Sequence, residues 1–179
     1  IQILSSGPNN SEEQIKNAYI KMINSATKRV YIQTPYFIPD ESMYDALRIA
    51  AMSGVEVKLM MPGIPDHKLV YWASISYFEH MLEAGVSCYV YRKGFMHAKT
   101  IVVDGQIASV GTANMDIRSF RLNFESNAII YDSQAASRLE RIFLEDLQHC
   151  DQLTLEEYKK RPMSSRFMES IARLLSPIL

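Results

Sequence analysis

The sequence is poor in cysteine and contains no long apolar run. Only two of its 179 residues are cysteines, and Cys88 and Cys150 fit neither a metal-ligand spacing nor a disulfide framework. This usage indicates a reducing compartment. No apolar stretch approaches the roughly 20 residues that cross a bilayer, and no signal peptide is recognisable. We therefore expect any membrane anchor to lie outside this chain.

The sequence also lacks a large net charge of either sign. Its 19 basic and 20 acidic residues give a formal net charge of −1, so no global field attracts nucleic acid or an anionic bilayer, although a local positive pocket is compatible with this balance. The balance argues against a nuclease, and we expect no nucleic-acid partner. A chain of this length with 47% hydrophobic residues can bury one core, which predicts a single domain over residues 1–179.

Helical and strand patterns alternate along the chain. Capping signals and apolar periodicity predict helices at 11–25, 40–53, 67–84, from 133, from 154 and at 164–175. Apolar runs predict strands at 29–34, 55–61, 86–91 and 128–131, with a hairpin over 97–112. This alternation predicts an α/β fold with a mixed, largely parallel sheet, helices on both faces and an added antiparallel hairpin. Loops 35–37 and 62–66 both follow strands, so they are expected near a shared edge.

The hairpin carries the most informative residues. Asp104-Gly105 predicts a type I′ turn, because both positions favour positive φ. If Val103 faces Gln106, the pairing places Lys99 opposite Val110 and His97 opposite Thr112. Alternate strand residues share a face. The side chains predicted to project to one side at the open end of the hairpin are His97, Lys99, Thr112 and Asn114.

These residue types suit phosphodiester chemistry. Lys99 supplies positive charge, while Thr112 and Asn114 can donate hydrogen bonds to phosphoryl oxygens. His97 can attack phosphorus when neutral, or give a proton to the leaving oxygen when protonated. Such a histidine needs its second ring nitrogen held by a carboxylate. A strand over 128–131 would bring Glu125 beside the hairpin, so Glu125 is the candidate for this orienting role.

The spacing His97-x-Lys99-x4-Asp104-x6-Gly111-Thr112-x-Asn114 resembles the HKD motif of the phospholipase D superfamily. Further segments resemble the C-terminal half of bacterial cardiolipin synthases: 33–39, 61–66, 114–119, 123–125 and the tail 173–177. The resemblance covers nearly the whole chain and implies a phospholipase D-like fold. It also implies a carboxylate near the position of Glu125 that holds the catalytic histidine, and a reaction that needs no cofactor and no metal.

The chain departs from this family in carrying one motif, whereas the family builds its site from two. In the family one histidine becomes a phosphohistidine and the other is the general acid. His67-Lys68 lacks the required spacing. The resemblance therefore implies a C-terminal half whose complement is an N-terminal half or a second copy of the chain. It implies a phosphatidyl transferase that converts two phosphatidylglycerol molecules into cardiolipin and glycerol, located in the full-length protein at the bacterial cytoplasmic membrane. The alternatives are a phospholipase D or phosphodiesterase hydrolase, and an inactive phosphate-binding or assembly half-domain.

Other residues near the motif receive weaker assignments. Asp104 lies in the predicted turn, far from the open end, so turn formation is favoured over direct catalysis. Candidate contacts with the substrate headgroup are Tyr36, Asp66 and His67. Arg118 and Arg121 flank the site. Phosphate binding and a surface ion pair both remain as alternative roles for these arginines.

Overall fold

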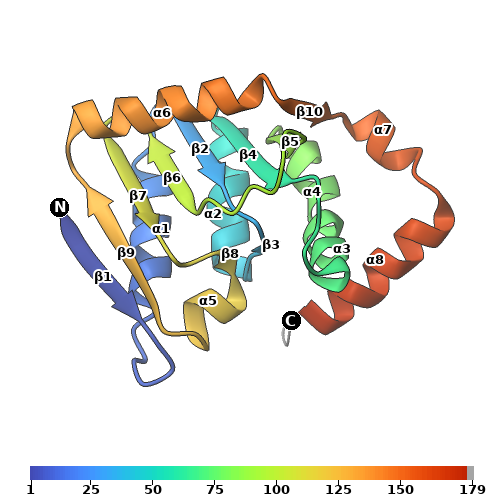
Figure 1. Ribbon diagram of the computed structural model, residues 1–179, viewed down its shortest axis with the longest axis horizontal. Helices are drawn as coiled ribbons and strands as arrows, with labels where there is room; N and C mark the ends of the chain where they lie inside the picture. Colours follow the sequence, from blue (N-terminus) through green and yellow to red (C-terminus); the bar gives the residue numbers. More distant parts are fainter. Residues whose placement is uncertain (177–179) are drawn as a thin grey trace.

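The computed structural model describes residues 1–176, so residues 177–179, including Pro177 of the family-like tail, lie outside the described part. An eight-stranded sheet organises the molecule (Figure 1). In spatial order its strands are β1 (Gln2–Ser6), β9 (Glu125–Ile130), β7 (Ile107–Gly111), β6 (Thr100–Val103), β2 (Arg29–Gln33), β4 (Glu56–Pro62), β5 (Ser87–Tyr91) and β10 (Cys150–Leu153). Two short strands, β3 (Phe37–Ile38) and β8 (Met115–Asp116), form a separate parallel pair.

The large sheet is mixed and mostly antiparallel. The pairs β2–β4 and β4–β5 are parallel, whereas the other neighbouring pairs are antiparallel. The predicted α/β class with a mixed sheet is confirmed, but the expectation of a largely parallel sheet is wrong. Two edge strands that the sequence pattern did not indicate, β1 and β10, both add antiparallel neighbours. Cys150 begins β10.

Helices cover both faces of the sheet, as predicted. Their bounds are α1 (Gln14–Asn24), α2 (Glu41–Met52), α3 (Lys68–Ser76), α4 (Phe78–Glu83), α5 (Ile117–Arg121), α6 (Ser133–Leu147), α7 (Leu155–Lys159) and α8 (Met163–Leu175). One face packs against α1, α2 and α4 in the main core, which includes Ile15, Leu47 and Phe78. The opposite face packs against α6, where Phe143 stacks on Tyr31 with ring centroids 4.8 Å apart.

Two of the predicted helix starts are confirmed by their caps. The Asp40 carboxylate accepts a hydrogen bond from the Met43 backbone N–H at 3.0 Å, and Thr154 forms a capping box with Glu157. The capping box predicted at Ser11 is wrong, because α1 begins after Glu13 with no side-chain cap. A serine or threonine at the right spacing is therefore not sufficient, since the cap also needs the chain before it to approach the helix at the right angle.

The long helix predicted over 67–84 is interrupted at Tyr77, which separates α3 from α4. Ser76 donates its hydroxyl to the Ala73 carbonyl at 2.6 Å, a side-chain bond that competes with the helical backbone pattern. The Ser74 hydroxyl accepts from the Phe37 backbone N–H at 3.0 Å. Ser74 thus anchors α3 to β3, and β3 follows the loop that reaches the motif.

Candidate active site

The turn of the hairpin has the predicted conformation, but the strands pair one residue out of the predicted register. Asp104 and Gly105 have φ of 53° and 64°, and the Gln106 N–H donates to the Val103 carbonyl at 2.9 Å. Val103 nevertheless pairs with Ile107. Gln106 is thus left outside the ladder, as in a bulge, which shifts every later pair.

This shift overturns the predicted partners of the motif residues. Val110 pairs with Thr100 instead of Lys99, and the Gly111 N–H donates to the Lys99 carbonyl at 3.4 Å. His97 precedes β6 in an irregular segment and has no ladder partner there. The motif is therefore presented by the loop that enters β6, not by a continuous strand.

His97 is exposed between two aromatic rings. Its ring stacks on Phe95 with centroids 5.3 Å apart and meets the Tyr36 ring edge-on at 6.4 Å. Burial by these neighbours, followed by the positive charge of Lys99, lowers the pKa of His97, while the carboxylate of Asp66 acts in the opposite direction. The ring is therefore neutral near pH 7 and can act as a nucleophile or accept a proton.

Lys99 is held close to the histidine. Its ammonium donates to the His97 carbonyl oxygen at 3.0 Å. Burial lowers the pKa of Lys99, and the negative charges of Glu125, Asp116 and Asp66 oppose that effect. The field of the three carboxylates thus favours a charged ammonium beside the exposed imidazole, as phosphate binding requires.

Glu125 begins β9, and β9 pairs with β7, so the carboxylate lies beside the hairpin as expected. Its Oε1 accepts a hydrogen bond from the Asn123 amide at 3.3 Å. Among residues 1–176 no hydrogen bond joins Glu125 to His97. The orienting role of Glu125 thus stays a prediction. The charge of Glu125 acts on Lys99 and on Asp116, raising the pKa of each.

The two neutral motif residues have different surroundings. The Thr112 hydroxyl accepts from the Ser126 N–H at 2.9 Å and so ties the end of β7 to β9. Asn114 is buried, its N–H donates to the Ser119 hydroxyl at 3.1 Å, and its Oδ1 has no hydrogen-bond partner within the described residues. Phosphate contacts by Thr112 and Asn114 stay predictions.

A small hollow of about 200 Å³ collects several candidates. It is lined by Tyr36, His67, Val70, Asn114, Asp116, Arg118 and Asn123. Sequence reasoning missed Asp116 and Asn123. Asp116 carries a usable signal, because it precedes α5 as a cap and accepts from the Ser119 N–H at 2.6 Å. Burial raises the pKa of Asp116.

The two loops that follow strands meet at this hollow. The Tyr36 hydroxyl donates to Asp66 Oδ2, and Asp66 Oδ1 accepts from the His67 N–H at 2.7 Å. Burial alone would raise the pKa of Asp66, but these hydrogen bonds outweigh it and lower the pKa. The expectation that loops 35–37 and 62–66 share an edge is confirmed.

Asp104 occupies the far end of the hairpin. Its carboxylate accepts hydrogen bonds from the N–H groups of Thr27, Lys28 and Arg29 and from the Thr27 hydroxyl at 2.8–2.9 Å. These bonds overcome the effect of burial and lower the pKa of Asp104. In this structure the aspartate of the motif joins the hairpin to the start of β2.

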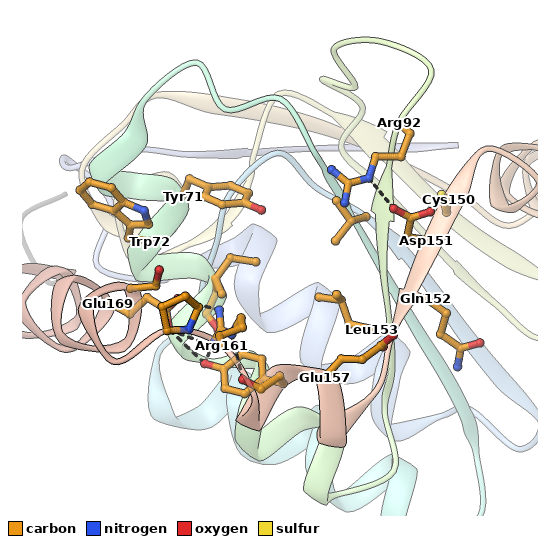
Figure 2. Close-up of a pocket in the computed structure, with 15 residues that line it drawn as sticks. Tyr71, Trp72, Arg92, Cys150, Asp151, Gln152, Leu153, Glu157, Arg161 and Glu169 are labelled. Atoms are coloured by element: carbon orange, nitrogen blue, oxygen red, sulfur yellow. Dashed lines mark hydrogen bonds and ion pairs between the residues drawn. The ribbon is translucent and has the colours of Figure 1, made fainter.

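A larger hollow of about 820 Å³ lies between α3, β10, α7 and α8 (Figure 2). None of the predicted site residues lines it. Its arginines are engaged, because Arg161 binds Glu169 at 2.6 and 2.8 Å and Arg92 binds Asp151 at 2.7 Å. Size alone therefore does not mark the site. Nowhere within residues 1–176 do three or more His, Cys, Asp and Glu side chains gather as metal ligands.

The segment that carries the motif matches a known protein family. Residues 19–147 match the family described as cardiolipin synthase, PLD-like domain. The chain belongs to this family. The matched segment contains the whole HKD-like spacing, together with Tyr36 and Asp66 near His97 and Glu125 near Lys99.

Curated members of the family resemble this chain over nearly all of the chain's own residues. The cardiolipin synthase of Clostridium perfringens strain SM101 is 60% identical over 178 residues, which is 99% of this chain and 37% of the relative. The major cardiolipin synthase ClsA of Bacillus subtilis strain 168 is 59% identical over 179 residues, which is 100% of this chain and 37% of the relative. The chain thus spans little more than a third of these relatives.

Solved structures show the same fold at low sequence identity. The phospholipase D family member NUC from Salmonella typhimurium has a TM-score of 0.73 at 17% identity, covering 86% of this chain and 98% of that one. The phosphatidylserine synthase of Haemophilus influenzae has a TM-score of 0.79 at 17% identity, covering 99% of this chain and 47% of that one. The phospholipase D-like fold is therefore confirmed, and it occurs both as nearly a whole chain and as about half of a longer one.

Proposed function

We propose that this chain is one half of a phosphatidyl transferase that converts two phosphatidylglycerol molecules into cardiolipin and glycerol. The observation that carries the proposal is an exposed His97 next to Lys99 in a chain that is 60% identical to a cardiolipin synthase over 178 residues. The lowered pKa of His97 supports a nucleophilic role for this residue, because an imidazole that attacks phosphorus must be neutral at the start of the reaction.

The reaction needs two histidines in complementary protonation states. In one assignment, His97 attacks the phosphorus of a first phosphatidylglycerol, and a second motif histidine protonates the departing glycerol oxygen. The second lipid then gives its glycerol hydroxyl proton to that same histidine, attacks the phosphohistidine and releases His97. The reverse assignment exchanges the two histidines. Lys99 stabilises the phosphoryl oxygens in both, so no metal or cofactor is required.

The partner that supplies the second histidine is an N-terminal half or a second copy of this chain. Exposed apolar side chains near the site support the binding of such a partner over it. Phe95 next to His97 is 49% exposed, Leu122 is 53% exposed, and Phe124, which precedes Glu125, is 74% exposed. Covering them would also exclude water from the phosphohistidine, which favours transfer to a lipid over hydrolysis.

The proposed place of work is the bacterial cytoplasmic membrane, because both substrates are bilayer lipids. No helix among residues 1–176 is long and apolar enough to cross a membrane.

A chimera tests this function. The matching segment of the Bacillus subtilis ClsA, 59% identical to this chain, is replaced by residues 1–179, and the purified protein is incubated with phosphatidylglycerol vesicles. We expect cardiolipin and glycerol in equal amounts, at a rate that EDTA leaves unchanged. Phosphatidic acid without cardiolipin, also when an alcohol acceptor is present, would instead support the hydrolase. A folded but inactive chimera would support the assembly module.

A further inference from the structure

Helix α8 turns an apolar face to solvent. The exposed apolar side chains of α8 are Met163 at 82%, Phe167 at 66%, Ile171 at 36%, Leu174 at 82% and Leu175 at 39%. At about 100° per residue they fall within roughly 120° of the helix circumference. These five side chains are called the α8 apolar face below. Soluble proteins rarely expose such a continuous apolar stripe unless it binds something.

The opposite side of α8 is fixed to the protein, so the helix cannot roll to hide this face. Ala172 is fully buried in a cluster that includes Ala73 and the partly buried Leu69 and Trp72 of α3. Glu169, the one acidic residue of the helix, is 5% exposed and neutralised by Arg161 (Figure 2). Rolling α8 would break this ion pair and expose Ala172.

The exposed charges of α8 are all positive. Arg166 and Arg173 are exposed, and neither forms an ion pair within residues 1–176. The Arg173 guanidinium lies 4.8 Å from the centre of the Tyr77 ring. Both arginines lie on the same side of the helix, about 120–140° from the centre of the apolar face. Apolar side chains bordered by arginines complement the interface of an anionic bilayer, where the cations reach lipid headgroups.

The position of α8 relative to the site fits such a contact. Val70 of α3 lines the small hollow that contains Asn114, while Leu69 and Trp72 of the same helix pack in the cluster with Ala172. One helix therefore separates α8 from the candidate site. Helix α8 is about 20 Å long, shorter than the roughly 30 Å apolar core of a bilayer, so it fits in the plane of the interface and not across it.

We propose that α8 lies in the interface of a bilayer containing anionic phospholipid, with the α8 apolar face among the acyl chains and Arg166 and Arg173 at the headgroups. The proposal rests on the proposed function only in that the bilayer also holds the substrate. The contact would keep the site next to the lipid surface while substrates exchange.

Vesicle sedimentation of the 179-residue chain tests the contact. We expect stronger binding to phosphatidylglycerol vesicles than to phosphatidylcholine vesicles, and about tenfold weaker binding to both after Phe167→Ser with Leu174→Ser. Arg166→Gln with Arg173→Gln should remove the preference for the anionic lipid. The matched control is Ile49→Ser with Met52→Ser on α2, since these side chains are 55% and 66% exposed, and it should bind as the parent does. Circular dichroism must show the same helix content in all variants.

A depth measurement separates a lipid contact from a protein contact. In a Trp72→Phe background, which removes the single tryptophan, Phe167→Trp places a fluorophore in the apolar face. Brominated phosphatidylglycerol should quench it, and should not quench the control Tyr131→Trp, at a position 62% exposed. Absence of quenching would overturn the proposal. So would a chain that is dimeric without lipid and becomes monomeric with Phe167→Ser, because the face would then belong to a second copy.

A catalytic variant keeps the two proposals distinguishable. His97→Ala should bind vesicles as the parent does, because His97 lies outside α8. Normal vesicle binding by a chimera that makes no cardiolipin would contradict the proposed function alone. Cardiolipin synthesis by a chimera whose α8 is never quenched by brominated lipid would contradict the α8 contact alone.

Discussion

The ionisation of His97 depends on its burial and on two charged neighbours. Because burial and Lys99 lower its pKa, we expect the imidazole to titrate below its ordinary value of about 6.5. Lys99→Met should raise this pKa, and Asp66→Asn should lower it, since the carboxylate favours the charged ring. NMR titration of the His97 ring protons measures both. A rise with Asp66→Asn, or no change with Lys99→Met, would contradict the assigned neighbours.

Asp104 should affect stability and leave catalysis nearly unchanged. Asp104→Asn tolerates the positive φ but weakens the bonds to Thr27, Lys28 and Arg29, so we expect a loss of about 1–3 kcal/mol at pH 7. The folded pKa of Asp104 is lowered, so this stabilisation is present above the unfolded pKa of about 3.9 and is lost as the pH falls through the folded value. Urea unfolding should thus show the difference from the parent shrinking below about pH 4.

The control for Asp104 is Asp45→Asn, because Asp45 is 44% exposed and makes one longer ion pair, with Arg48 at 3.3 Å. It should change the free energy of unfolding by less than about 0.5 kcal/mol. The Asp104→Asn chimera is compared with the parent chimera. If the two are equally stable but the variant has lost its turnover, Asp104 belongs to the catalytic network instead.

Residues whose role follows from local geometry were predictable. The positive φ of Asp104 and Gly105 follows from the residue pair itself, and the cap at Asp40 follows from its place before an apolar repeat. The partner of Thr112 was not predictable. Its bond to Ser126 depends on the register between β7 and β9, which are separated along the chain. The displacement of Gln106 that shifts the β6–β7 register likewise has no distinct signal in the sequence.

Among the elements, β7 and β9 approach each other closely at Gly111. A Cβ on Gly111 would lie 2.4 Å from the Ser126 carbonyl oxygen and 2.4 Å from Asn127 Cγ. A backbone oxygen cannot move without moving β9, so Gly111→Ala should cost about 2–4 kcal/mol. Val110→Ala, at the neighbouring position that is 37% exposed, should cost less than about 1 kcal/mol. Equal unfolding midpoints in urea for the two variants would contradict this packing.

Elements with a strong pattern were predictable, and short or edge elements were not. The capped helix at Thr154 and the buried strand β4 appear where the sequence places them. The edge strands β1 and β10 are short and partly polar, with little apolar alternation to reveal them. The interruption of the helix at Tyr77 accompanies a bond from Ser76 back to Ala73 and a bond between Ser74 and β3, which a periodic pattern cannot show.

At the scale of the whole molecule, the presence of a single HKD-like motif predicts that activity depends on assembly with a second motif. If light scattering shows the 179-residue chain to be a monomer, we expect less than about 1% of the cardiolipin synthesis of the chimera, because the second histidine is missing. If it is a dimer, activity should fall on dilution together with the dimer fraction. A monomer as active as the chimera would contradict the need for two motifs.

The measurement that tests the central claim most directly is the rate of cardiolipin synthesis by the chimera with and without His97. His97→Ala should lower turnover by on the order of a hundredfold or more, with an unchanged melting temperature. His149→Ala is the matched control, because His149 lies near Lys93 at 3.2 Å, away from the small hollow, and its chimera should keep the parent rate. A His97→Ala chimera that retains a third of the parent rate would contradict the claim that His97 takes part in phosphatidyl transfer.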